Sequence, residues 1–290
     1  MKISKRIFRT FSRFLPDSVY LKLHYRRKMK KKLNLRCPQT FNEKMQWLKL
    51  YDRKPFYSTL VDKYAVKQYV SNIIGEKYLI PTLGVWDCFD DIDFDNLPDQ
   101  FVLKCTHDSG SVKIIRNKNT CNFTELKEFF DKRAKDNYSF YSREWAYKSV
   151  KPRIIAEEYI VFVEGQSLVD YKFFCFSGKP MFLYVSTGMA DHSTAMMSFY
   201  DLEGKELPFH RSDYLSYHNA IMPDNFGEMK QLAMLLAEKV NNSFIRIDLY
   251  SNGSTIYFSE FTFFPCGGQL PFAPEEWDLR IGQMIKLPKK

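Results

Sequence analysis

The chain has 290 residues, of which 45% are hydrophobic and 17% aromatic, so it can bury a sizeable core and is not disordered. It contains no apolar run of about 18 residues, which argues against a membrane-spanning helix. Its six cysteines lack metal-ligand spacing, so free thiols in a reducing cytoplasm are expected.

The formal net charge of +9 suggests nucleic-acid binding until the charges are located along the chain. Residues 1–36 contain thirteen Lys and Arg residues and one acid, a net +12, which leaves −3 for the rest. The mildly acidic body argues against a nucleic-acid partner.

Within this basic head, apolar residues recur at spacings of three and four, which predicts an amphipathic helical segment. These residues are Ile3, Ile7, Phe8, Phe11, Phe14 and Leu15. The head could lie on an anionic membrane, dock on the body with its charges in solvent, or bind an acidic glycan or lipid-linked phosphate.

Two helices and a short strand are predicted between residues 37 and 98. Thr40, with Glu43 in the first turn, is typical of a helix start, and a second helix with a buried stripe is predicted over 62–70. A short strand is predicted at 83–86, before an acidic connector.

The remainder predicts strands interrupted by two helices, one starting at Thr124 as its cap and running to 135, the other over 227–240. The predicted strands cover 101–105, 112–115, 154–160, 171–176, 181–185, 244–250 and 255–264. Turn-forming residues at 177–180 and 251–254 predict antiparallel hairpins. The pattern indicates an α+β fold with mostly antiparallel sheets in at least two lobes.

Polar residues occur in register within the last two, otherwise apolar, strands. Arg246 and Asp248 share one face of a strand, and Glu260 and Thr262 share a face of the next. A hairpin can bring these faces together, and converging carboxylates require a cation, such as Mg²⁺ with its phosphate ligands. A surface salt-bridge patch is the simpler alternative.

A lysine and a small-residue loop form a second candidate group. Lys104 ends a buried strand and needs an anionic partner. The loop that follows contains Ser109, Gly110 and Ser111, whose backbone N–H groups could bind phosphate, and Lys113 and Lys63 could assist.

A third candidate group is the strand end Glu157, Glu158, Tyr159 and Ile160. Its carboxylates and apolar edge suit an adenine amino group and ribose hydroxyls. Paired glutamates at an exposed strand end are also common without any ligand.

Taken in this order, these features resemble the ATP-grasp superfamily. The resemblance is closest to its TupA-like branch, which is associated with teichuronopeptide and other surface-polysaccharide synthesis. The segments that carry it are 40–44, 62–66, 86–87, 101–104, 155–159, 170–174, 246–250 and 260–263.

This resemblance implies that ATP is clamped between two α+β lobes. The basic head (1–36) and a small N-terminal α/β region (37–98) would precede a small lobe (99–160) and a C-terminal lobe with the metal site (161–290).

The resemblance also implies roles for single residues. Lys104 would bind the phosphate or adenine side of ATP, residues 157–160 would line adenine and ribose, and Lys172 would reach phosphate. Asp248 and Glu260 would hold Mg²⁺, and Arg246 would steady the transition state that forms an acyl phosphate. Thr262 stands where family members usually carry Asn, and Glu164 is a further candidate for ribose.

The implied reaction is phosphorylation of a carboxylate, from a uronic acid or amino acid, by the ATP γ-phosphate, followed by amine attack to give an amide and phosphate. A saccharide or lipid-linked glycan would be the acceptor in capsule or O-antigen-type synthesis. A sugar kinase with the same ATP site, or a glycosyltransferase that binds a sugar nucleotide, are the alternatives. The enzyme would work in the cytoplasm, with its head available to the inner face of the membrane.

Overall fold

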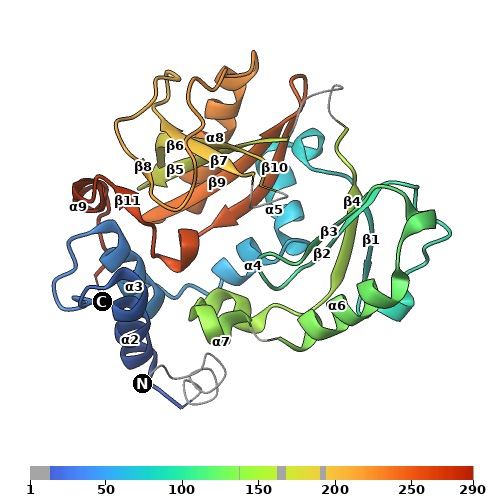
Figure 1. Cartoon of the computed structure of the whole chain (residues 1–290), viewed down its shortest axis with the longest axis horizontal. Helices are drawn as coiled ribbons and strands as arrows, with labels where there is room; N and C mark the ends of the chain where they lie inside the picture. The colour runs from blue at the N-terminus through green and yellow to red at the C-terminus, as the bar shows by residue number, and fades with distance from the viewer. Residues whose placement is uncertain (1–13, 137, 162–167, 190–193, 290) are drawn as a thin grey trace.

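The computed structural model describes residues 14–136, 138–161, 168–189 and 194–289 (Figure 1). Residues 1–13 of the basic head and the candidate ribose ligand Glu164 lie outside these ranges. The described chain forms a four-stranded sheet at one end of the molecule and a five-stranded sheet at the other, with helices between and around them.

The smaller sheet is antiparallel, with strand order β1-β4-β2-β3. Its strands are β1 (Thr82–Trp86), β2 (Phe101–Cys105), β3 (Val112–Ile115) and β4 (Ile154–Glu158). Alternate residues point to opposite faces, so Phe101 and Leu103 join the hydrophobic core under α6 (Phe123–Lys135), whereas Lys104 points away from it. The prediction that Thr124 caps this helix was wrong: the Asn122 side chain accepts the N–H of Glu125.

The larger sheet is also antiparallel, with strand order β10-β9-β5-β6-β7. Its strands are β5 (Val169–Phe176), β6 (Lys179–Thr187), β7 (Met196–Tyr200), β9 (Phe244–Ser251) and β10 (Ile256–Thr262). The predicted hairpins are confirmed, and at the first of them Ser177 and Gly178 both have positive φ, as a tight hairpin turn requires. Helix α8 (Phe226–Val240) packs against β5, β6 and β9.

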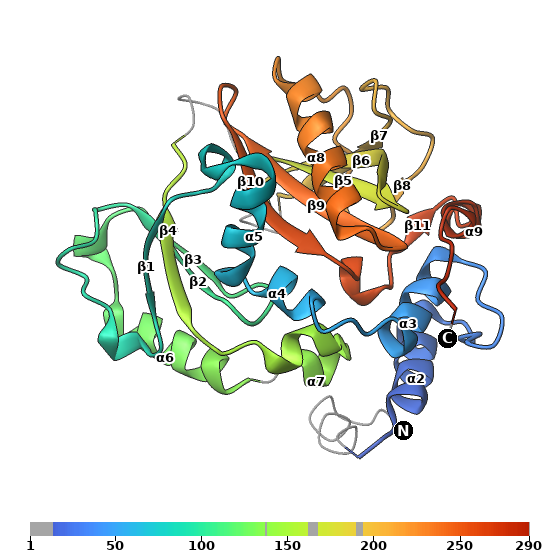
Figure 2. The same ribbon diagram turned by 180° about the vertical axis from the view of Figure 1, so that it is seen from behind.

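The N-terminal helices belong to the core of the larger lobe. They are α2 (Asp17–Met29), α3 (Phe41–Tyr51), α4 (Tyr57–Val61) and α5 (Ala65–Ile74). The predicted start of α3 is confirmed, because Thr40 and Glu43 form a reciprocal capping box. Helices α4 and α5 lie between the two sheets (Figure 2), so residues 37–98 supply helices to one lobe and strand β1 to the other.

The remaining elements are short. They are α7 (Tyr138–Ser142), α9 (Glu276–Gln283), the paired strands β8 (His210–Arg211) and β11 (Phe272–Ala273), and the 3₁₀ turns η1 (Glu76–Tyr78), η2 (Phe89–Asp91), η3 (Lys118–Thr120), η4 (Trp145–Ser149) and η5 (Pro265–Gly267). Within the described ranges, every helix is too short or too polar to traverse a bilayer.

Candidate functional site

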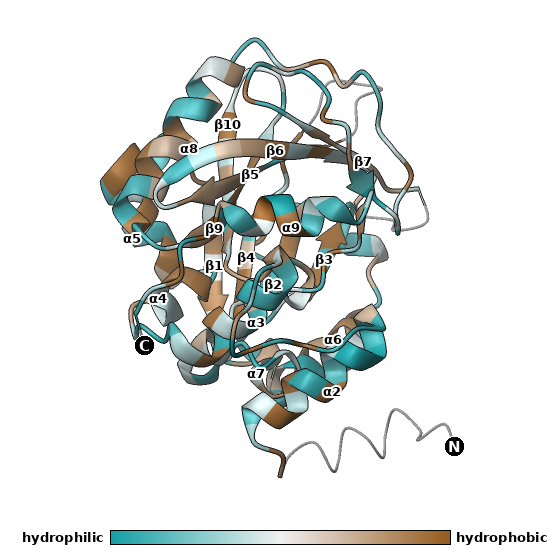
Figure 3. Cartoon of the chain, turned by 90° about the vertical axis from the view of Figure 1, so that its left-hand side faces the viewer, coloured by the Kyte–Doolittle hydropathy of each residue, from teal (hydrophilic) through white to brown (hydrophobic). Residues whose placement is uncertain are grey.

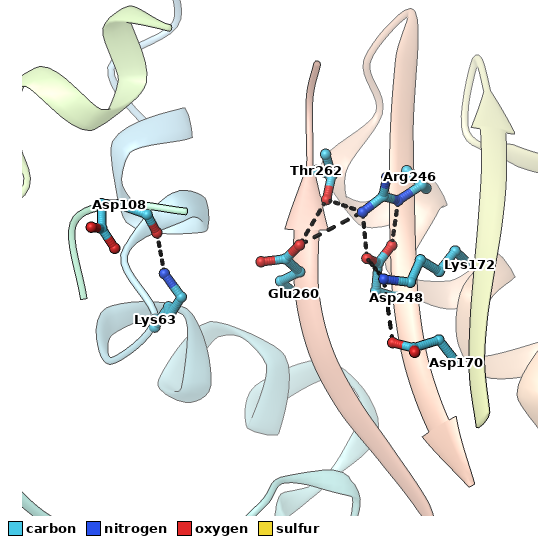
Figure 4. Close-up of polar contacts among 8 residues, drawn as sticks. All are labelled: Lys63, Asp108, Asp170, Lys172, Arg246, Asp248, Glu260 and Thr262. Carbon is cyan, nitrogen blue, oxygen red and sulfur yellow. Dashed lines mark hydrogen bonds and ion pairs between the residues drawn. The ribbon is translucent and has the colours of Figure 1, made fainter. Parts of the chain in front are cut away.

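Three neighbouring strands of the larger sheet place polar side chains on one face. Lys172 of β5 lies opposite Asp248 of β9, which in turn lies opposite Glu260 of β10. Two pairs further along, Arg246 lies opposite Thr262. Figure 4 shows these side chains, with Asp170, pointing toward one another. We call these six residues the β-sheet cluster.

A β-bulge in β10 creates this alignment. Phe258 pairs with Leu249, but the next partners are Glu260 and Asp248, so one extra residue, Ser259, is inserted between them. Without the insertion, Glu260 would lie opposite Ile247 and face the hydrophobic core. The bulge therefore moves the Glu260 carboxylate onto the polar face.

Arg246 holds the cluster together. Its Nε and Nη2 donate to the two carboxylate oxygens of Asp248 at 2.6 and 2.5 Å. Nη2 also donates to Thr262 Oγ1 at 2.9 Å and lies 3.6 Å from Glu260 Oε1. Such a bidentate arrangement fixes the Asp248 carboxylate more firmly than a single contact would.

Lys172 extends the cluster to a third acid. Its Nζ lies 3.2 Å from Asp170 Oδ1 and 3.5 Å from Asp248 Oδ2. Burial alone would lower the pKa of Lys172, but Asp170, Tyr184 and Asp248 raise it well above its ordinary value. Burial also raises the pKa of Asp170, an effect that Lys172 only partly opposes.

The charges of the β-sheet cluster do not balance. Three acids meet two bases, and the only substantially accessible acid is Glu260, whose side chain is 38% exposed, against 1% for Asp248. No group of three or more His, Cys, Asp or Glu side chains within the described ranges is arranged to hold a metal. Two carboxylates nevertheless fit Mg²⁺, which takes one or two from the protein and further oxygens from a phosphate ligand.

A second group of charged side chains lies at the inner face of the smaller sheet and consists of Lys67, Lys104 and Glu157. We call it the lysine triad. The Glu157 carboxylate of β4 accepts Lys104 Nζ of β2 and Lys67 Nζ of α5, each at 2.5 Å. Burial would raise the pKa of Glu157, but the two lysines hold it below its ordinary value. Burial likewise disfavours the charge on Lys104, but Glu157, Tyr250 and Glu260 raise its pKa above its ordinary value.

The two groups are electrostatically connected. Burial and, after it, Asp170 raise the pKa of Tyr250 on β9, Lys104 and Lys172 lower it, and the net result is a pKa of about 12. Glu260 also raises the pKa of Lys104, so charges in the β-sheet cluster affect the protonation of the lysine triad.

Two cavities adjoin the lysine triad and share Lys67 and Leu79 in their walls. The smaller, also lined by Lys63, Lys104 and Glu157, has a volume of about 10 Å³, enough for about one water. The larger has a volume of about 450 Å³, within the usual range for small-molecule sites.

The loop after β2 is held from two sides. Arg133 of α6 donates to Ser111 Oγ at 2.6 Å and to the Ser109 carbonyl at 3.0 Å, and pairs with Asp108 at 2.8 Å. Lys63 Nζ donates to the Asp108 carbonyl, across from Glu260 in Figure 4. Gly110 has a φ of 87°, a conformation that favours glycine.

Some residues named from the sequence lie apart from these groups. Lys113 lies opposite Leu103, on the outer face of the smaller sheet, with its Nζ 4.5 Å from the centre of the Phe129 ring. Glu158 is exposed and faces away from Glu157, while Tyr159 lies near Arg116 and, with Ile160, is half-buried. The structure therefore brings Glu157 to the lysines but not Lys113 or Glu158.

The sequence prediction missed Lys67 and gave little weight to Lys63. These lysines are four residues apart, a spacing that places side chains on the same face of a helix. Their common direction could have been predicted, but their partners, Glu157 and the Asp108 carbonyl, come from distant parts of the chain.

Comparisons with known proteins identify a matching family and several similar solved structures. Residues 43–286 match the model of the family described as TupA-like ATPgrasp. A search of curated proteins gave no match.

Among solved structures, the chain is similar to a D-alanine–D-alanine ligase from Bacillus anthracis complexed with ATP, at 16% identity and a TM-score of 0.44, over 79% of this chain and 66% of that one. It is also similar to a D-alanine–D-alanine ligase from Helicobacter pylori, at 13% identity and a TM-score of 0.44, over 84% of this chain and 69% of that one. A third similar structure is a RimK domain ATP-grasp protein from Sphaerobacter thermophilus, at 12% identity and a TM-score of 0.44, over 81% of this chain and 70% of that one.

Proposed function

The chain belongs to the TupA-like ATP-grasp family, and we propose that it is an ATP-dependent ligase that activates a carboxylate as an acyl phosphate for amide formation. The carboxylate would belong to a uronic acid or amino acid, and a saccharide or lipid-linked glycan would be the acceptor in surface-polysaccharide synthesis. ATP supply makes the cytoplasm the compartment for this reaction.

One observation carries this proposal: Asp248 and Glu260 are direct cross-strand partners beside the guanidinium of Arg246. Two adjacent carboxylates favour a divalent cation, and a guanidinium beside them favours the charge that develops on a transferring phosphoryl group. Metal-assisted phosphoryl transfer uses both features together.

We assign Mg²⁺ to Asp248 and Glu260, with Thr262 as a weaker third oxygen. Each carboxylate oxygen can accept more than one partner, so the contacts of Asp248 with Arg246 leave acceptor capacity for a cation. The bound cation would neutralise phosphate charge and orient the phosphate oxygens.

The protein side chains then have distinct tasks. Lys104 and Lys63 would bind the phosphates together with the Ser109–Ser111 backbone, and Lys172 would contact the transferred phosphate from the sheet. Glu157 would turn toward the adenine amino group once nucleotide competes for its lysines. Because the cavity at Glu157 holds about one water, ATP entry requires the lobes or these side chains to move apart.

A thermal-shift measurement tests the nucleotide and metal assignment. ATP with Mg²⁺ should raise the Tm of the wild type, and Glu260→Gln should abolish the part of the shift that depends on Mg²⁺. Glu238→Gln is the matched control, since Glu238 is exposed on α8, away from both groups. An unchanged Mg²⁺ effect in the Glu260 variant would refute the metal assignment.

Product analysis separates a ligase from the alternatives. With glucuronate as the probe carboxylate and hydroxylamine as the trapping amine, a ligase forms ADP, inorganic phosphate and a hydroxamate. ADP together with a phosphorylated sugar would instead indicate a kinase. Binding of a sugar nucleotide in the absence of ATP would indicate a glycosyltransferase.

A further inference from the structure

Helix α2 is attached to the larger lobe through one face. Tyr20, Leu21 and Tyr25 are buried, and the Tyr20 hydroxyl donates to the Tyr141 carbonyl at 2.8 Å. On the same side, Gln269 Nε2 donates to His24 Nδ1 at 2.9 Å. These contacts fix the helix on the body and determine which of its side chains point outward.

The outward face of α2 combines apolar and basic side chains. Val19 and Leu23 are 41% and 47% exposed, and Lys22 and Arg26 are exposed beside them at helical spacings of three and four. Phe14, just before the helix, is 86% exposed. Large apolar side chains that stay in water among cations indicate a surface that is covered in use.

The charge around this face has one sign. Between residues 14 and 36 the exposed cations are Lys22, Arg26, Arg27, Lys28, Lys30, Lys31, Lys32 and Arg36. The single acid of this segment, Asp17, pairs with Arg53 at 2.7 Å and with Arg143 at 3.1 Å, both from the body. Glu275 of the body pairs with Lys31. Figure 3 shows α2 at the edge of the molecule.

We propose that residues 14–32 form a docking surface for an anionic lipid membrane. Phe14, Val19 and Leu23 would enter the boundary between headgroups and acyl chains, and the surrounding cations would bind headgroup phosphates. Helix α2 has 13 residues, too few to span a bilayer, so the attachment is peripheral.

The exposed apolar residues favour a membrane over a soluble acidic glycan. A polyanion in water is bound by the cations alone and gains little from Val19 and Leu23, whereas a bilayer buries both. The smaller sheet lies at the opposite end of the molecule from α2 in Figures 1 and 2, so docking leaves the lobe with the lysine triad away from the lipid. The net charge of −3 on the rest of the chain would favour this orientation.

Co-sedimentation of the full chain with vesicles tests the proposal. The protein should bind equimolar phosphatidylglycerol–phosphatidylcholine vesicles at low salt and should not bind pure phosphatidylcholine. The variant Lys22→Glu/Arg26→Glu should bind more than about 25-fold more weakly, since each cation near an anionic membrane contributes about five-fold. Lys179→Glu/Lys239→Glu, with the same change in net charge at exposed positions elsewhere, should bind far better than the α2 variant.

A second variant distinguishes lipid from glycan. Val19→Ser/Leu23→Ser keeps every cation and should weaken vesicle binding while leaving any binding to soluble polygalacturonate unchanged. An equal loss of vesicle binding in Lys22→Glu/Arg26→Glu and in Lys179→Glu/Lys239→Glu would overturn the proposal. Unchanged vesicle binding by Val19→Ser/Leu23→Ser would also overturn it. All substituted side chains are exposed, and a thermal melt of each variant confirms folding independently of lipid. Nucleotide binding is measured separately, so failure here leaves the proposed ligase function untouched.

Discussion

The lysine triad and the β-sheet cluster both bury ionised groups, but with opposite charge. The triad has two lysines and one carboxylate, all nearly buried, and leaves one positive charge. The β-sheet cluster has three carboxylates and two bases, and leaves one negative charge near the exposed Glu260.

This difference indicates what each group can bind. Excess positive charge at the lysine triad favours the phosphates of a nucleotide, whereas excess negative charge at the β-sheet cluster favours a cation. A metal–triphosphate complex carries both kinds of charge, so it satisfies the two groups together.

Asp248→Ala should have the largest effect. It leaves Arg246 without its bidentate partner and deprives Lys172 of one acid, and breaking such a buried pair costs about 3–5 kcal/mol of unfolding free energy. Mg²⁺-dependent nucleotide binding should also disappear. Urea unfolding gives the stability change, with Glu238→Ala as a surface control expected within about 0.5 kcal/mol of wild type. A near-normal stability for Asp248→Ala would show that Asp248 does not hold Arg246 and Lys172 in place in the folded protein.

Lys104→Met should weaken ATP binding by about 1.5–3 kcal/mol, a rise of about 10- to 150-fold in Kd, because a charged hydrogen bond to the nucleotide is lost. Lys113→Met is the matched control, since Lys113 lies on the opposite face of the same sheet and should bind ATP normally. Isothermal titration with ATP and Mg²⁺ measures both constants. Similar losses in the two variants would contradict the placement of nucleotide on the inner face.

The two groups should respond to pH in opposite directions. The folded pKa of Glu157 lies below its ordinary value of 4.5, so its stabilisation is complete above that pH and is lost as the pH falls. The folded pKa of Asp170 lies above its ordinary value of 3.8, so the folded state binds the proton more tightly and stability from this group falls as the pH rises.

Unfolding free energies of Glu157→Gln and Asp170→Asn, each compared with wild type between about pH 3.5 and 6.5, check this sign difference. The advantage of wild type over Glu157→Gln should grow with pH, and that over Asp170→Asn should shrink. Slopes of the same sign would show that the two groups do not differ in the proposed way.

Thr262→Asn should have the smallest effect. The Thr262 hydroxyl accepts from Arg246 and donates to Glu260 at 3.2 Å, and an amide can keep both contacts while offering Mg²⁺ a better oxygen. We expect the Mg²⁺ affinity of the ATP complex to rise a few-fold, by about 1 kcal/mol at most. Thr262→Val, which removes the hydroxyl, should lower it. Weaker Mg²⁺ binding by the Asn variant would exclude Thr262 from the metal site.

Local patterns in the sequence determined most of the helices and strands and which polar residues of each strand share a face. A period of two places Arg246 with Asp248, and Glu260 with Thr262, because alternate side chains of any strand share a face. Thr40 and Glu43 start α3 for an equally local reason, since a capping box lies within four residues.

Tertiary structure alone decided how these local pieces meet. The bulge at Ser259 aligns Glu260 with Asp248, and strand alternation by itself does not reveal such an insertion. Glu157 meets Lys104, 53 positions away, because β4 pairs with β2, and it meets Lys67, 90 positions away, because the fold places α5 beside the inner face of the smaller sheet. Contacts between separate elements depend on how the whole fold packs. The spacing of residues along the sequence does not give the distance between them in space.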